Sequence, residues 1–184
     1  MKYSVEQLLS VEGGRWDRRI ATDLATELEI QLGEKEQTIP EIRRLLAVKG
    51  FRELRKRLEL ETWNKKGEEA VRAMAFSMRA FAHERPGLSA AAFRSPATDS
   101  IEWRQEGERL SGLAIEIFIG SGLDARSAST ALRILRALVR GFVLHEMAAS
   151  FLDGVDYEQT FVAAVDVFIR GLDALRAPPA GSPI

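Results

Sequence analysis

The most concentrated chemistry in the sequence is a run of basic residues between positions 43 and 66. This segment holds nine basic and three acidic residues, whereas residues 1–42 hold five basic and nine acidic ones. The formal net charge of the whole chain is −1, so the excess of positive charge is local. Such clusters bind the phosphates of nucleic acids. The alternative is a solvated helix face on which Glu and Arg pair at helical spacing.

Catalytic and metal-binding chemistry has weak support. The chain has no cysteine, which excludes thiolate metal sites, disulfides and cysteine nucleophiles. His83 and His145 are each followed by glutamate, and neighbouring residues on a helix point about 100° apart. Neither pair is a ligand face alone, but the two histidines could share a metal ion if they met across a bundle. Without a catalytic triad or a phosphate-binding glycine loop, we predict no enzyme activity, no catalytic residue, no metal and no cofactor.

The elements that position these residues are expected to be helices throughout, because apolar residues recur at spacings of three to four. Glycine, proline and capping residues mark the ends, with Thr38, Asp124 and Asp156 as N-caps and Gly50 as a break between two helices. The helices are expected at residues 4–11, 16–32, 41–48, 51–85 with a break near 64–67, 101–119, from Asp124 to Leu152, and from Asp156 to Arg176.

Composition favours a folded protein without membrane segments. Hydrophobic residues make up 46% of the 184 residues and charged ones 29%, which suits one domain or a small head on a larger body. The N-terminus lacks the apolar run of a signal peptide, and no stretch has the length of apolar sequence that spans a bilayer. We therefore predict a cytoplasmic protein that does not bind membranes.

The last two long helices carry wide apolar faces. Phe161, Val165, Phe168 and Leu172 recur at spacings of four, three and four, and the preceding helix is apolar on more than one side. We predict that one face meets the same face of a second subunit, with two-fold symmetry. The alternative is that both helices form only the core of one chain. The predicted dimer contacts are Leu132, Leu135, Phe142, Phe161, Val165, Phe168 and Leu172.

Aromatic residues and methionines are candidates for a ligand pocket in the body, since they form adaptable apolar walls. The alternative for each of them is ordinary core packing. The candidates are Trp63, Met74, Met78, Phe81, Trp103, Phe118 and Met147.

Three segments resemble the TetR (tetracycline-repressor-like) regulator family, in the subgroup with a WHG-type C-terminal domain. Residues 48–58 resemble the junction between the DNA-reading helix and the connecting helix, and residues 78–88 resemble the turn written YRAFAxxHPGLY. Residues 131–143 and 161–172 resemble the paired dimerisation helices. The resemblance covers roughly residues 48–176 and implies a homodimer that binds near-palindromic operator DNA and releases it when a small apolar effector binds.

The N-terminal head departs from the family pattern LAxxLGVxxxSLYxHV. The expected Ser, Tyr and His are replaced by Arg43, Leu45 and Ala47, and only Lys49 matches a family position, as a phosphate contact. A helix starting at Lys49 to Phe51 would also present backbone N–H groups to that phosphate. The predicted DNA contacts are Thr38, Arg43, Arg44, Lys49 and Arg52.

Together these patterns predict an all-α protein with a small three-helix head on a larger antiparallel body. Residues 1–49 are the expected helix-turn-helix-like head, 50–177 the ligand-binding and dimerisation domain, and 178–184 a disordered tail. The predicted function is that of a homodimeric transcriptional regulator, most simply a repressor, that a small apolar ligand releases from its operator. The alternative is a helical dimerisation or ligand-binding module that has lost sequence-specific DNA binding.

Overall fold

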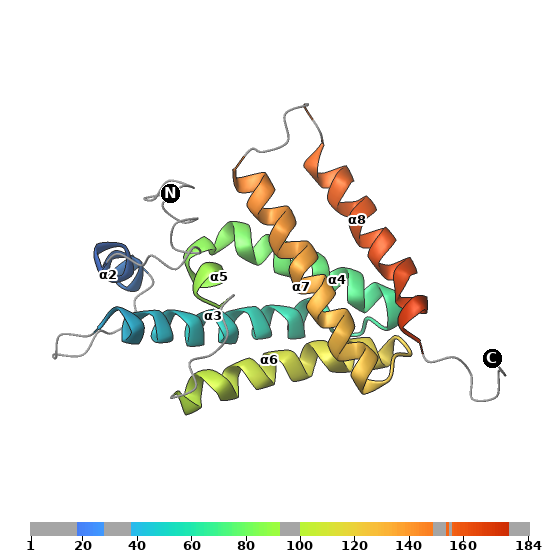
Figure 1. Cartoon of the computed structure of the whole chain (residues 1–184), viewed down its shortest axis with the longest axis horizontal. Coiled ribbons are helices and arrows are strands. Elements are labelled where there is room, and N and C mark those ends of the chain that lie inside the picture. The colour runs from blue at the N-terminus through green and yellow to red at the C-terminus, as the bar shows by residue number, and fades with distance from the viewer. Residues whose placement is uncertain (1–17, 28–37, 93–99, 149–153, 155, 177–184) are drawn as a thin grey trace. The chain divides into compact units, whose positions relative to one another are not determined.

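Every element that the structure describes is helical, which confirms the all-α prediction for these residues. The computed structural model describes residues 18–27, 38–92, 100–148, 154 and 156–176 (Figure 1). The expected helix 4–11, the loop before Ser100 and the C-terminal tail lie outside them. The helices are α2 (Arg18–Glu27), α3 (Ile39–Glu61), α4 (Gly67–Glu84), α5 (Pro86–Ala92), α6 (Ile101–Gly120), α7 (Ala125–Met147) and α8 (Tyr157–Gly171), followed by a 3₁₀ helix (Leu172–Leu175).

The three predicted N-caps are confirmed. Thr38 and Glu41 form a capping box at the start of α3, in which the backbone N–H and the hydroxyl of Thr38 donate to the Glu41 carboxylate at 2.6 and 2.8 Å. These hydrogen bonds, the backbone one first, lower the pKa of Glu41. Asp124 and Asp156 accept backbone N–H groups of the first turns of α7 and α8. Local side-chain chemistry therefore fixes where these helices begin.

The predicted helix break at Gly50 is wrong, because α3 runs without interruption from Ile39 to Glu61. Gly50 is buried, and a Cβ added to it would lie 2.8 Å from the carbonyl oxygen of Leu88 and 3.3 Å from the Cβ of Ala92. The glycine therefore permits close contact between α3 and α5 and does not end a helix. The predicted break near residues 64–67 is confirmed, since Asn64 and Gly67 adopt positive φ angles of 61° and 55° between α3 and α4.

The short helix α5 was not predicted. Pro86 was expected only to end the preceding helix, but it also begins a new one, since proline is well suited to the first helical position. The residues from Gly87 to Ala92 are all buried, and all of them except Leu88 are Gly, Ser or Ala. Side chains of this size allow neighbouring backbones to approach closely.

The chain divides into two compact units. Unit 1 comprises Met1–Lys56 and Ala80–Leu110, and unit 2 comprises Arg57–Arg79 and Ser111–Ile184. The predicted boundary at residue 49 falls inside α3 and differs from this division. Its assignment of DNA binding to residues 1–49 and of ligand binding to the rest stays a prediction.

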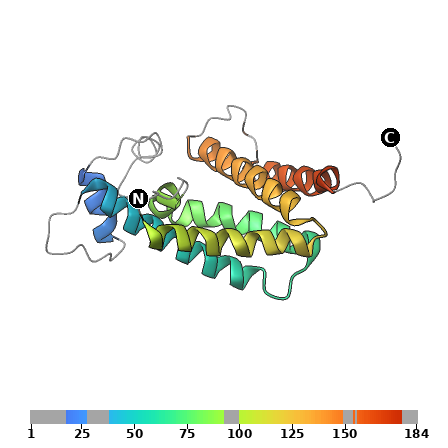
Figure 2. The same ribbon diagram turned by 60° about the horizontal axis from the view of Figure 1, so that its bottom comes forward.

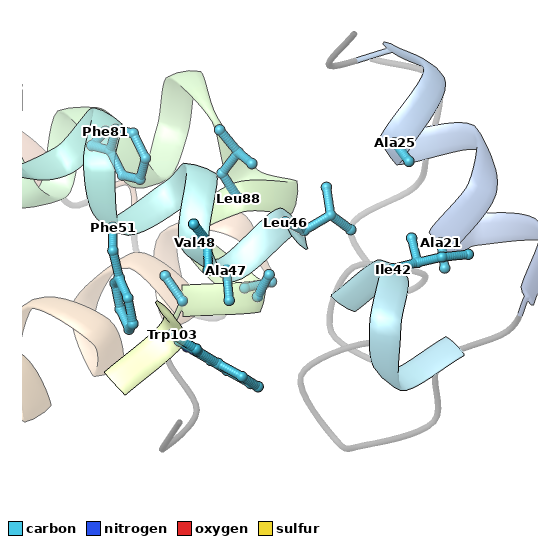
Figure 3. Close-up of a cluster of buried hydrophobic side chains, with 13 residues drawn as sticks. Ala21, Ala25, Ile42, Leu46, Ala47, Val48, Phe51, Phe81, Leu88 and Trp103 are labelled. Carbon is cyan, nitrogen blue, oxygen red and sulfur yellow. The ribbon is translucent and has the colours of Figure 1, made fainter. Parts of the chain in front are cut away.

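Unit 1 has a core of small and aromatic side chains. Ala21 and Ala25 of α2 belong to the same buried cluster as Ile42 and Leu46 of α3, and Figure 3 shows Ala21 beside Ile42. Farther along α3 the cluster continues with Ala47, Val48 and Phe51, which share it with Phe81, Leu88 and Trp103. Leu54 and Leu110 cover its edge.

Unit 2 is built around aromatic contacts. Helices α7 and α8 run antiparallel and lie side by side in both views (Figures 1 and 2). Phe161 of α8 contacts Phe76 of α4 and Phe142 of α7, with ring centroids 5.1 and 5.0 Å apart. Phe168 contacts Phe118 of α6 at 6.1 Å. These edge-to-face contacts join four helices into one core.

Candidate DNA-binding and effector-binding sites

Helix α3 carries seven basic and four acidic residues. Lys49, Arg52 and Lys56 share one face of the helix, since they are three and seven residues apart. Arg52 and Lys56 are exposed and Lys49 is half-buried. Arg43 and Arg44, also predicted to contact DNA, lie in the first turns of α3 and are half-buried. The basic segment of the sequence is therefore a basic helix with an exposed cationic face.

Arg52 is tied to α6 within unit 1. Its Nε donates to Glu106 Oε1 at 3.0 Å and its Nη2 to Glu102 Oε1 at 2.9 Å. The hydrogen bond with Glu106 is the main cause that raises the pKa of Arg52. Because both carboxylates already neutralise this guanidinium, a DNA phosphate would have to displace them. Arg52 is thus first of all a structural contact between two helices.

Lys49 is not at a helix start. It lies in the interior of α3 and pairs loosely with Glu53, with the Lys49 Nζ 3.8 Å from the Glu53 Oε1. An N–H group inside a helix bonds to the carbonyl four residues earlier, so the N–H groups of residues 49–51 are not free for a phosphate. That part of the prediction is wrong. The first turn of α3 is instead at Ile39, after the Thr38 cap.

The predicted pocket residues fall into three groups. Met74, Met78 and Phe118 are buried in unit 2, where Met147 is half-buried. Phe81 and Trp103 are buried in unit 1. Trp63 is 75% exposed just after α3, so its assignment to the wall of an enclosed pocket is wrong. The remaining residues have the burial that a pocket wall requires, and their role in binding stays a prediction.

A charged cluster in unit 2 was missed by sequence reasoning. Arg79 of α4 donates from Nε and Nη2 to both oxygens of Glu146 on α7, at 3.1 and 2.6 Å, and from Nη1 to Glu158 on α8 at 2.5 Å. Its guanidinium also lies over the Phe161 ring, 4.7 Å from the centroid. These hydrogen bonds, Glu146 first, raise the pKa of Arg79. Only the charges were visible in the sequence, and their pairing depends on tertiary packing.

A second charged cluster, in unit 1, is only partly satisfied. Glu106 is 3% exposed, and its Oε1 accepts hydrogen bonds from Arg52 and from Arg109 Nη1 at 2.9 Å. Its Oε2 is buried and has no hydrogen-bond partner among the described residues. The indole Nε1 of Trp103, one turn earlier on α6, is likewise buried without a partner. Trp103 had been predicted as a ligand contact, but nothing in the sequence marked Glu106 as buried.

The predicted dimer contacts are all buried inside a single chain, so these side chains form intramolecular core, which was the alternative interpretation of the pattern. On the same two helices, Ile134 of α7 and Val167 of α8 are 45% and 63% exposed. Any surface left for a second copy therefore lies on other residues than predicted. The buried set is Leu132, Leu135, Phe142, Phe161, Val165, Phe168 and Leu172.

The two histidines belong to different units of the chain. His83 and His145 are both exposed, on α4 and α7. Within the described ranges, no three His, Asp or Glu side chains gather where they could hold a metal ion. In the same ranges, no helix combines the length and apolar character needed to cross a bilayer.

Comparison with known proteins assigns the chain to a family. A family model described as the tetracycline-repressor-like C-terminal domain matches residues 71–168. A solved structure of a protein of unknown function from Rhodococcus sp. RHA1 has a similar fold, with a TM-score of 0.64 and 20% identity over 90% of this chain and 92% of that one. No curated protein matches the chain. Since the family model covers more than half of the sequence, the chain belongs to the tetracycline-repressor-like (TetR) family, through its C-terminal domain.

Proposed function

We propose that the chain is a homodimeric transcriptional regulator that binds operator DNA and releases it when a small, largely apolar effector binds. The observation that carries the proposal is the combination of a TetR-like C-terminal domain with the basic helix α3 on its N-terminal side. A basic helix in a chain whose overall charge is near zero is suited to one localised contact with a polyanion.

The DNA contact is proposed at the N-terminal half of α3. Arg43 and Arg44 follow the capped start of this helix, and Lys49 lies one to two turns farther on. Arginine and lysine at these places would bind backbone phosphates, while the capping residue Thr38 fixes where the helix begins. Arg52 is better explained as the tie to Glu102 and Glu106.

The dimer contact is proposed on the outer faces of α7 and α8. Ile134 and Val167 are large apolar side chains left exposed there, and Ala137 and Ala163 beside them are also exposed. Such side chains permit close contact between helices of two subunits. A symmetric four-helix contact would cover both helices of each chain.

The effector is proposed to bind among the buried side chains of the C-terminal domain. Met74, Met78 and Phe118 of unit 2 supply an apolar wall of flexible and aromatic side chains. Phe81 and Trp103 are the corresponding candidates in unit 1.

A second function is favoured by the residues of the N-terminal head and by the ion pairs of Arg52. Arg52 is held by two carboxylates, and the residues expected for the family's reading helix are replaced by Arg43, Leu45 and Ala47. These features fit a dimeric ligand-binding module that no longer reads a DNA sequence. This alternative predicts dimers in solution that do not bind duplex DNA even at low salt.

The experiment that tests the proposal is a titration of duplex DNA at several salt concentrations. The regulator should bind with an affinity that falls steeply with salt, and Arg44→Ala and Lys49→Ala should each reduce the slope of log K against log salt by about 1. Lys66→Ala, which removes an exposed lysine after α3, is the matched control and should leave the slope unchanged. Equal slopes for all four proteins would remove the N-terminal half of α3 from the DNA interface.

A further inference from the structure

Two buried polar side chains of α6, Trp103 and Glu106, indicate the kind of ligand that could bind there. A carboxylate has two oxygens, each of which accepts hydrogen bonds, and burying one without a partner is costly. In Glu106, Oε1 takes two hydrogen bonds from Arg52 and Arg109, while Oε2 has no partner among the residues that the structure describes. Native proteins retain such groups mainly where they serve a purpose.

Trp103 supplies the complementary group. Its indole is buried in the cluster that contains Phe51 and Ala47 (Figure 3), and its Nε1–H has no acceptor within the described part of the chain. The backbone N–H of Trp103 faces Ser100 Oγ at 3.3 Å, which anchors this turn of α6. Residues three apart on a helix have Cβ atoms about 5–6 Å from each other. The side chains that carry this donor and this acceptor therefore leave α6 one turn apart, on the same side of the helix.

We propose that Trp103 Nε1 and Glu106 Oε2 form a hydrogen-bonding site for a small ligand that carries both an acceptor and a donor, of which a carboxamide or a hydroxyl group is the simplest form. A ligand group that bonds to both would lie about 2.9 Å from each of the two polar atoms. The oxygen of the ligand accepts from the indole, and its N–H or O–H donates to the carboxylate.

The charge and burial of the side chains around this site narrow the chemical class of the ligand further. Arg52 and Arg109 balance Glu102 and Glu106, so the cluster as a whole is neutral. A charged ligand would lose its hydration without gaining a counter-charge, which is unfavourable in a buried place. The side chains around Trp103 are apolar, including Phe51 and Leu110. The ligand is therefore neutral, with one polar group on an apolar body.

The identification of this ligand as the effector rests on the proposed function, whereas the site itself does not. It refines the effector from a purely apolar molecule to one with an amide-like or alcohol-like end. It also places that end in unit 1, because Arg52, Trp103, Glu106 and Arg109 all belong to that unit.

The experiment follows the indole N–H resonance of Trp103 by ¹H–¹⁵N NMR while benzamide, benzyl alcohol, toluene, benzoate and benzylammonium are titrated into the full chain. Benzamide and benzyl alcohol should shift this resonance, and benzamide should bind about tenfold more tightly than toluene, as expected for one well-made hydrogen bond. Benzoate and benzylammonium should bind more weakly than benzamide. Equal binding of benzamide and toluene, or no saturable shift up to about 20 mM of a ligand of this size, would overturn the proposal.

Two matched pairs of variants make the test specific. Trp103→Phe keeps a ring but removes the N–H, so it should raise the Kd of benzamide about tenfold and leave toluene unchanged. Trp63→Phe alters an indole that is exposed and should change neither, while it assigns one of the other two indole resonances of the three tryptophans. Glu106→Gln should weaken benzamide, whereas Glu102→Gln, which removes the other partner of Arg52, should not. An unchanged benzamide Kd in both Trp103→Phe and Glu106→Gln would also overturn the site.

The outcome is separable from that of the proposed function. Duplex DNA binding is measured on the same proteins without probes. DNA binding without a benzamide shift at Trp103 would remove this site and leave the regulator proposal standing. A benzamide shift without DNA binding would leave the site and remove the DNA-binding arm.

Discussion

The two charged clusters of the molecule are built from the same residue types but are completed to different degrees. In unit 2, Arg79 uses three of its nitrogens on two carboxylates and lies over an aromatic ring. In unit 1, Glu106 takes two arginines on one oxygen, and its other oxygen has no partner in the ranges that the structure describes. A satisfied buried network specifies a structure, whereas a half-satisfied one costs stability unless something else completes it. We therefore assign Arg79 to the frame of unit 2 and Glu106 to a binding site.

The sharpest contrast within unit 2 is between neighbouring residues of α8. Phe168→Asp places a charge against Phe118 in the core and should destabilise the fold by more than about 4 kcal/mol. Val167→Asp alters an exposed side chain and should leave the chain folded but monomeric. Urea unfolding and sedimentation measure the two effects. A folded Val167→Asp dimer would mean that the outer face of α8 is not the contact between subunits.

Breaking the Arg79 cluster should have the next largest effect. Arg79 and Glu146 are 13% and 7% exposed, so Arg79→Ala leaves a buried carboxylate uncompensated and should lower the free energy of unfolding by about 3 kcal/mol. Arg72→Ala removes an arginine from a half-exposed pair with Asp166 and serves as the control, with a loss below about 1 kcal/mol. Similar losses of unfolding free energy in the two variants would mean that Arg79 contributes no more to stability than Arg72 does.

Unit 1 should be sensitive to close backbone packing. Gly50→Ala gains helix propensity but places a methyl group 2.8 Å from the Leu88 carbonyl oxygen, and we expect a net loss of about 1–2 kcal/mol. Gly112→Ala, in α6 with open space around it, is the matched control and should gain up to about 1 kcal/mol. Thermal or urea unfolding compares the two. Stabilisation by both substitutions would mean that α3 and α5 do not pack as closely as described.

The smallest effect should come from the unsatisfied carboxylate. Glu106→Gln removes a charge whose arginine partners are about half exposed, and it also removes a buried anionic oxygen without a partner. The two changes oppose each other, so we expect a loss of about 1 kcal/mol or less. Glu146→Gln should cost about 3 kcal/mol, because both oxygens of Glu146 bind Arg79. If urea unfolding shows equal losses of unfolding free energy for Glu106→Gln and Glu146→Gln, the two clusters do not differ in their contribution to stability.

Helix ends that depend on residues close in the sequence could be predicted from the sequence alone. Thr38, Asp124 and Asp156 were recognised as caps because a short polar side chain before an apolar run satisfies the free N–H groups of a helix. The break at Asn64 and Gly67 follows equally from local conformational preference. These residues account for the starts of α3, α4, α7 and α8 and for the end of α3.

Features that depend on a distant neighbour were not predictable. Gly50 looks like a helix breaker until Leu88 is found against it. Phe161 and Phe168 have the spacing of a contact between subunits, but Phe76 and Phe118 of the same chain cover them. The partners of Arg79 are 67 and 79 residues away. Periodicity identifies an apolar face but not the molecule that covers it.

The central claim, that this TetR-family chain is a sequence-reading regulator, is tested most directly by selection from a pool of random duplex DNA at about physiological salt. The account predicts enrichment of a near-palindromic site, because a two-fold dimer presents two copies of α3 to the duplex. A folded dimer that enriches no sequence would contradict the account and establish the ligand-binding module in its place.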